Sequence, residues 1–127
     1  MIDARHVLSD LQAITGDTIS TNVIKLPATA LLHHMDQGVK KFRFHCTVGV
    51  VFAGGTSLIS SLQDSADGVT YTNTEIVSAD IVQATLVAGY EILNWFLPVG
   101  ILQWIAAYYN DTGEFTGGKV NAWIDCD

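Results

Sequence analysis

The sequence predicts an all-β domain whose architecture is a jelly-roll-like antiparallel β-sandwich. Apolar and polar residues alternate with a period of two in several segments, whereas no segment keeps a helical repeat over three turns. Turn signals divide the chain into seven or eight short strands at roughly 8–12-residue spacing, which is typical of sandwiches and jelly rolls. A chain of 127 residues has room for one domain. We expect the sandwich over residues 21–127, preceded by residues 1–20 as an N-terminal arm or short helix.

The N-terminal segment leaves two conformations open. The residues "ARHVLSDLQAI" at 4–14 fit a short helix and an extended arm equally well. The opening "MIDARHVLSD" lacks the charged and then apolar regions of a secretory signal. Apolar runs stop well short of the roughly 20 residues that a membrane-spanning helix needs. We therefore expect a soluble protein that is made in the cytoplasm and has no membrane partner.

The longest strand is predicted at 42–52, "FRFHCTVGVVF", where strict alternation separates two faces. One face carries Phe42, Phe44, Cys46, Val48, Val50 and Phe52, and the other carries Arg43, His45, Thr47, Gly49 and Val51. An antiparallel strand with one apolar and one polar face packs its apolar face on the core. Cys46 is thus expected in the core, and two cysteines are too few for a disulfide framework.

The other strand candidates follow turn signals along the chain. They are a run around Leu58, Ser60 and Leu62, weaker candidates within 74–87, and the segments 90–98, 101–110 and 119–124. "LQDSADGVTY" and "NDTGEF" carry the Asp and Gly chemistry of turns. The strand at 101–109 is apolar on both faces, so it is either buried on both sides within its own domain or partly covered by another chain.

Composition favours burial of some apolar surface against other chains. Hydrophobic residues make up 49% of the chain and charged residues only 15%, which is rich in apolar side chains for a small monomer. Trp and Tyr are enriched at protein contacts. We expect core and interface roles to be shared among Trp95, Trp104, Tyr109 and Trp123.

Two stretches place a pair of glycines after an aromatic residue: "FAGGTSLISSL" at 52–62 and "FTGGKVNAWI" at 115–124. Neither has the spacing of a phosphate-binding loop, and β-type alternation follows where such a loop needs a helix. We expect structural turns instead, in which the glycines supply positive φ angles or bulges and the phenylalanines anchor the corners in the core. The turn glycines are Gly54, Gly55, Gly117 and Gly118.

Motifs that carry chemistry are not found in the sequence. The four histidines do not form HxH or HxxxH spacings, and there is no CxxC pair. "DSADG" at 64–68 looks like a calcium loop, but Ala66 stands where the second carboxylate ligand belongs, so a turn is the better interpretation. Neither a G-x-S-x-G nucleophile motif nor a marked carboxylate pair is present. We predict no enzymatic activity, no cofactor and no metal site.

Charge argues against nucleic-acid binding. The formal net charge is −7, and the chain lacks the basic footprint that contacts with phosphates require. One basic cluster exists, Lys40, Lys41 and Arg43 in "KKFR". It is either a solvated strand end or a patch that forms salt bridges with an acidic partner surface.

An ordered series of segments then points to a family. It comprises "MIDA" with "SDLQAIT", "STNVIKL" at 20–26, "DQG" at 36–38, "FAGGTSLISSLQDSADG" at 52–68, "ATLVAGYEI" at 84–92, "LPVG" at 97–100 and "FTGGKVNAWI" at 115–124. With these segments the chain resembles the small capsid cement (decoration) proteins of the Bordetella-phage type, nearly end to end.

This resemblance implies a jelly-roll sandwich on the outer capsid surface of a virion, assembled in the bacterial host cytoplasm. Its partners would be the major capsid protein and further copies of itself, with a homodimer favoured over a trimer. Its work would be mechanical, because added contact area holds neighbouring capsomers against the pressure of packaged DNA. Two other functions stay open: a sandwich that binds carbohydrate or another small ligand, and a different virion module of the tail or baseplate.

Overall fold

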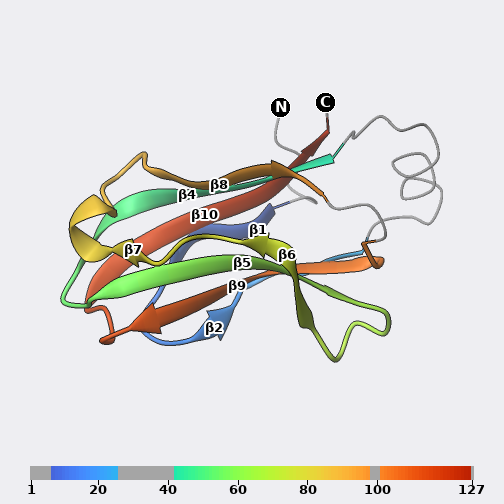
Figure 1. The fold of residues 1–127 in the computed structure, drawn as a ribbon, viewed down its shortest axis with the longest axis horizontal. Helices are drawn as coiled ribbons and strands as arrows, with labels where there is room; N and C mark the ends of the chain where they lie inside the picture. Colours follow the sequence, from blue (N-terminus) through green and yellow to red (C-terminus); the bar gives the residue numbers. More distant parts are fainter. Residues whose placement is uncertain (1–6, 26–41, 98–100, 127) are drawn as a thin grey trace.

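Two antiparallel sheets lie face to face in the computed structural model, which describes residues 7–25, 42–97 and 101–126 (Figure 1). The first sheet has the order β1 (Val7–Ala13), β10 (Gly117–Cys126), β4 (Phe42–Ala53) and β8 (Glu91–Phe96). The second has the order β2 (Thr18–Ile19), β9 (Trp104–Thr112), β5 (Ser57–Ser65) and β6 (Thr72–Val77). Two short strands extend it, β3 (Ile24–Lys25) beside β9 and β7 (Ile81–Val82) beside β5, and a 3₁₀ turn spans Gln83–Thr85.

The pairing of the strands is that of a jelly roll. The first main strand pairs with the last and each later strand pairs with an earlier one in nested order: β1 with β10, β2 and β3 with β9, β4 with β8, and β5 with β6. This long antiparallel ribbon is rolled up by two further pairings, β10 with β4 and β9 with β5. Eight main strands in two sheets with this connection form the jelly roll, so the predicted all-β fold class is confirmed.

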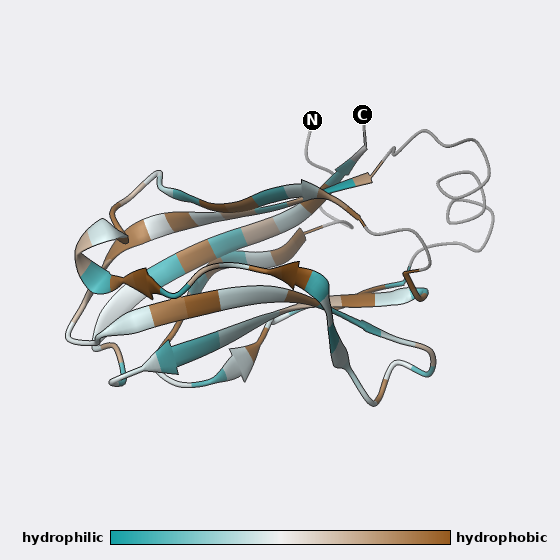
Figure 2. Cartoon of the chain, in the orientation of Figure 1, coloured by the Kyte–Doolittle hydropathy of each residue, from teal (hydrophilic) through white to brown (hydrophobic). Residues whose placement is uncertain are grey.

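The alternation predicted in 42–52 appears in β4, with one exception. Phe44, Cys46, Val48 and Phe52 are buried in the core as expected. Val50 belongs to the same sequence pattern but is 41% exposed, so its assignment to the core face is wrong. The register with β10 shifts twice here, since Val48 pairs with Val120, Val50 with Lys119 and Ala53 with Gly117. Such bulges rotate the strand locally and re-aim its side chains. Figure 2 shows the alternation of apolar and polar residues along β4 and β10.

The N-terminal segment contains a strand over Val7–Ala13, which corrects the helix alternative for the described part of 4–14. Within it, β1 pairs with β10 as the outer strand of the first sheet, and Leu8 and Ile14 are fully buried. Further on, β2 pairs with β9 in the second sheet. The described part of residues 1–20 therefore contributes one strand to each layer of the sandwich. Cross-strand hydrogen bonds with the C-terminal half satisfy the backbone polar groups of these strands.

Candidate interaction surface

An exposed tryptophan marks the side of the sandwich where the two sheets end. A hollow of about 470 Å³ lies between β6 and β8, the outer strands of their sheets. It is lined by Glu75, Ile76, Val77, Ile92, Leu93, Asn94 and Trp95, which we call the edge surface. Trp95 is 64% exposed and Val77 is 46% exposed. A half-open hollow with a large exposed aromatic side chain has the character of a protein contact.

The strand register explains why Trp95 is exposed. Trp95 pairs with Phe44, whose side chain is fully buried in the core. Side chains of directly paired residues stand on the same face of a sheet, so Trp95 leaves β8 on the inner side. Among the described strands, none follows β8 in this sheet. The indole therefore extends past the edge of the sandwich instead of into its core.

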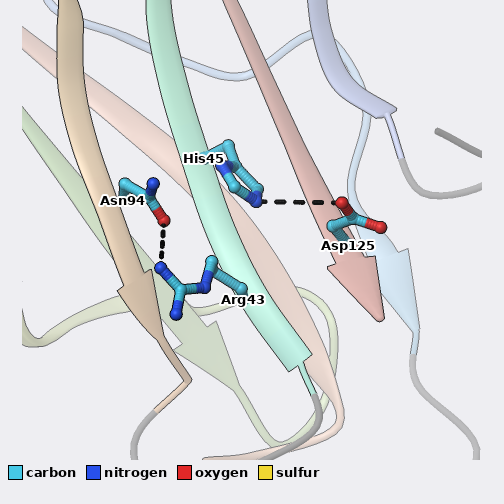
Figure 3. Close-up of polar contacts among 4 residues, drawn as sticks. All are labelled: Arg43, His45, Asn94 and Asp125. Atoms are coloured by element: carbon cyan, nitrogen blue, oxygen red, sulfur yellow. Dashed lines mark hydrogen bonds and ion pairs between the residues drawn. The ribbon is translucent and has the colours of Figure 1, made fainter. Parts of the chain in front are cut away.

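Arg43 is held by two side chains of β8 on the outer face of the first sheet. Its Nη1 atom donates a hydrogen bond of 2.8 Å to Oδ1 of Asn94, and its guanidinium carbon lies 4.2 Å from the ring centroid of Phe96. Figure 3 shows Arg43 and Asn94 pointing toward each other from β4 and β8. A guanidinium over an aromatic face is attracted by the quadrupole of the ring. The position of this charge is thus set by cross-strand neighbours.

His45 stands between an aromatic ring and a carboxylate on β10. Its imidazole is stacked on the indole of Trp123, with centroids 5.0 Å apart and planes 10° apart. Its Nε2 atom lies 3.9 Å from Oδ2 of Asp125 (Figure 3). His45 and Trp123 are direct cross-strand partners, so the sheet register itself brings the two rings together. The outer face is therefore an ordered mixture of aromatic and polar groups.

The sequence "DSADG" forms a turn, as predicted. Oδ1 of Asp67 accepts hydrogen bonds from the hydroxyl of Ser65 at 2.8 Å and from the backbone N–H groups of Val69 at 2.9 Å and Thr70 at 3.1 Å. The N–H groups of Val69 and Thr70 and then the Ser65 hydroxyl lower the pKa of Asp67 to about 2, because they stabilise its charged form. In the described part of the chain, no group of three or more His, Cys, Asp or Glu side chains is arranged to hold a metal ion.

The comparison with protein-family models places this fold in a family. The model named Bbp16 matches residues 8–124, which run from within β1 to within β10. The chain belongs to the Bbp16 family. The name of the family points to a protein of a Bordetella phage. A search among curated proteins found no match. Within residues 7–25, 42–97 and 101–126, no helix of this Bbp16-family chain is long and apolar enough to span a membrane.

The residues predicted for an interface take different places in the Bbp16-family fold. Trp95 lies on the edge surface, while Arg43 and Trp123 lie on the outer face of the first sheet. Lys40 and Lys41 lie outside the described residues. The structure brings Arg43 and Trp123 to neighbouring strands and separates both from the core. The contribution of these residues to an interface stays a prediction.

Tyr109 belongs to the core, which corrects its place among the interface residues. It is fully buried, and its hydroxyl lies 2.8 Å from Oγ of Ser9. Burial raises the pKa of its phenol well above the ordinary value. On β9 the side chain of Tyr109 points between the two sheets. The sequence pattern showed two apolar faces at 101–109 and did not indicate which of them is the inner face.

The other face of β9 is covered by the chain itself. The ammonium of Lys25, on the neighbouring strand β3, lies 5.3 Å from the ring centroid of Trp104. The loop at Gly68 also contacts this indole, since a Cβ atom added there would lie 2.8 Å from its Cε2 atom. Ala106 on the same face is fully buried. Burial on both sides within one domain therefore accounts for much of the apolar pattern at 101–109.

Sequence reasoning missed several residues of these surfaces. Asn94, Phe96 and Asp125 have no motif around them, and Val77 lies in a segment that was only weakly predicted as a strand. Their role follows from strand register alone. Phe96 on β8 pairs with Arg43, and Asp125 on β10 pairs with Arg43 on the opposite side of β4. The only sequence signal was the polar face of 42–52, which indicated that its neighbours would be polar as well.

Proposed function

We propose that this chain is a capsid cement (decoration) protein that binds the outside of an icosahedral phage shell as a homo-oligomer. Membership in a phage protein family gives the setting, and the jelly roll is a fold that viral capsid and lectin domains use. The observation that carries the proposal is the edge surface, where Trp95 and Val77 are exposed beside a hollow of about 470 Å³. A mechanical role requires apolar contact area of this kind.

The edge surface fits a contact that bridges major capsid subunits. Standard interfaces bury about 800 Å² on each partner, and Trp is the side chain most enriched among residues that dominate binding energy. Glu75 and Asn94 line the same hollow as Trp95, so an apolar centre is bordered by polar groups. A polar rim around a buried aromatic anchor is the usual arrangement at protein interfaces.

Quantitative mass spectrometry of purified virions tests this proposal, followed by heating of particles with and without the protein. A cement protein is present in hundreds of copies per particle, and particles that lack it release their DNA at a lower temperature. Copies in single figures or tens would instead assign the chain to a tail or baseplate module. Absence from virions would rule out both roles.

Variants of the chain locate the contact. Trp95→Ala is expected to lower occupancy on the capsid by roughly tenfold or more, because a tryptophan at the centre of an interface often contributes at least about 2 kcal/mol. Val51→Ala is the matched control: Val51 is 52% exposed but does not line the edge surface. Equal occupancy for both variants would show that another surface meets the capsid.

Two further contacts are part of the proposal. We place Lys40, Lys41 and Arg43 against acidic capsid surface, with Arg43 oriented by Asn94 and Phe96. Alanine at all three positions should weaken shell binding more at low salt than at moderate salt, since salt screens exposed charges. We also propose a homodimer, and light scattering after size exclusion that gives a monomer at micromolar concentration would contradict it.

A further inference from the structure

A groove runs over the outer face of the first sheet beside Trp123, away from the edge surface. Its volume is about 410 Å³, within the range of about 300–1,000 Å³ that small-molecule sites occupy. It is lined by Val7, Ser9, Asp10, Thr47, Asn121 and Trp123, from the three neighbouring strands β1, β10 and β4. None of these residues lines the hollow at Trp95.

Irregular pairing of β1 shapes this groove. The register of β1 with β10 shifts between Val7 and Ser9 and again between Ser9 and Gln12. Leu11, within the second irregularity, has a φ angle of 49°, which is uncommon for a residue with a side chain. Bulges and strained residues of this kind occur preferentially beside functional sites. Because of these irregularities, Asp10 and Leu11 do not take part in the regular pairing of β1 with β10, and they lie next to Asn121.

The strained residue fixes the orientation of one side chain in the groove. The N–H of Leu11 donates a hydrogen bond of 2.7 Å to Oδ1 of Asn121. This bond determines which end of the Asn121 amide is the oxygen, so the Nδ2 group remains as a donor. Gly49 leaves room for it, because a Cβ atom added there would lie 2.9 Å from Nδ2. The amide is thus positioned before any ligand arrives.

Three polar groups in the groove have hydrogen-bonding capacity that the described residues do not use. The carboxylate of Asp10, the hydroxyl of Thr47 and Nδ2 of Asn121 make no side-chain hydrogen bond within residues 7–25, 42–97 and 101–126. Together they provide an acceptor, a donor–acceptor and a donor. This set matches hydroxyl groups, each of which donates one hydrogen bond and accepts others.

The aromatic wall of the groove is also held in place. His45 covers one face of the Trp123 indole at 5.0 Å, and Asp125 lies 3.9 Å from the same imidazole. His45 therefore holds the indole from the β4 side, and Val7, the direct partner of Trp123 on β1, stands on the other side and lines the same groove. A rigid aromatic surface beside oriented polar groups is complementary to a molecule with an apolar face and polar edges.

From these observations we propose that the groove beside Trp123 binds a neutral pyranose unit of a glycan. The C–H face of the sugar packs on the indole, while its hydroxyls pair with Asp10, Thr47 and Asn121. The net charge of −7 and the carboxylate of Asp10 disfavour an anionic ligand. The inference does not rest on the cement proposal, because its test uses the isolated chain and the groove shares no residue with the edge surface.

The test titrates the full purified chain, followed by ¹H–¹⁵N NMR, separately with glucose, galactose, mannose, N-acetylglucosamine and N-acetylgalactosamine. We expect millimolar affinity for at least one sugar, with shifts centred on Asp10, Asn121 and the indole N–H of Trp123. Trp123→Ala should weaken binding by about tenfold or more, since aromatic contacts carry much of such affinity. Asp10→Ala, at an exposed position that tolerates substitution, should also weaken it. Trp95→Ala should bind as the wild type does.

Three results would overturn the proposal. One is that none of the five sugars shifts these signals. Another is that shifts centre on Trp95 or Trp104, or that Trp123→Ala and Asp10→Ala both bind as tightly as the wild type. The last is that the signals of Asp10, Asn121 and Trp123 move with protein concentration in the absence of sugar, which would make the groove a contact with a second copy.

Discussion

The rings of Phe52 and Phe115 meet edge to face, with centroids 4.7 Å apart and planes 79° apart. Each ring also covers a glycine of the other Gly-Gly stretch. A Cβ atom added to Gly118 would overlap the ring of Phe52, and one added to Gly55 would overlap the ring of Phe115. The two stretches therefore form one corner, which the backbone N–H of Thr116 joins to the carbonyl of Ala53 at 2.9 Å.

The first prediction concerns the coupling of the two rings. Phe52→Leu and Phe115→Leu should each destabilise the fold by about 1–2 kcal/mol, because both side chains are buried. The double variant should show a coupling energy of about 0.5–1.5 kcal/mol, the value of an edge-to-face pair beyond its buried area. Urea denaturation of the four proteins measures it. Strictly additive losses would show that the ring contact contributes nothing of its own.

A glycine series separates backbone strain from side-chain overlap. Gly118 has both a φ angle of 131° and the ring of Phe52 at its Cα, so Gly118→Ala should cost about 2–4 kcal/mol. Gly89→Ala, with a φ of 88° in open space, should cost about 1 kcal/mol, and Gly55→Ala tests the overlap alone. Gly16→Ala, with neither feature, is the control and should be neutral or slightly stabilising. An equal cost at all four positions would contradict this account.

Cys46 should be chemically protected in the folded state. It is fully buried, and burial raises the pKa of its thiol to about 12. In a Cys126→Ser background, alkylation by iodoacetamide at pH 8 should be slower by orders of magnitude than in urea, because only an exposed thiolate reacts. The native thiol stays neutral while the unfolded one ionises near pH 9. Folding stability should therefore fall as the pH rises from 9 toward 12. Rapid alkylation without denaturant would refute the buried placement.

Asp67 should titrate far below an ordinary carboxyl group. Its pKa is lowered to about 2 by the N–H groups of Val69 and Thr70 and by the hydroxyl of Ser65. A lowered pKa stabilises the fold at pH values above the unfolded value near 4, and this contribution is lost as the pH falls through about 2. NMR titration should show the amide signals of Val69 and Thr70 moving with that midpoint. Asp67→Asn should abolish the movement, and a midpoint near 4 would contradict the turn geometry.

Local features of the fold were predictable from the sequence because they depend on neighbours along the chain. The alternation in 42–52 placed Phe44, Cys46 and Val48 in the core correctly. Turn chemistry identified the loop at Asp67 and the corners at the Gly-Gly pairs. These signals lie within a few residues of each other, and side chains on a strand alternate with a fixed period.

Other features escaped sequence reasoning. The segment at 4–14 fits a short helix and an extended arm equally well, and pairing with β10, more than a hundred residues later, makes Val7–Ala13 a strand. Tyr109 and Trp104 followed the same apolar pattern, yet one is core and the other lies under Lys25. The exposure of Val50 depends on bulges in the pairing of β4 with β10, which no pattern in the local sequence indicated.

The sequence by itself therefore determined the fold class, the turns and the apolar face of the longest strand. Only the tertiary structure decided that Trp95 is exposed at an edge, that Arg43 meets Asn94, and that a groove opens beside Trp123. The physical reason is that these features arise from the register between strands distant in the chain. A shift of one residue in register reverses the face to which every following side chain points.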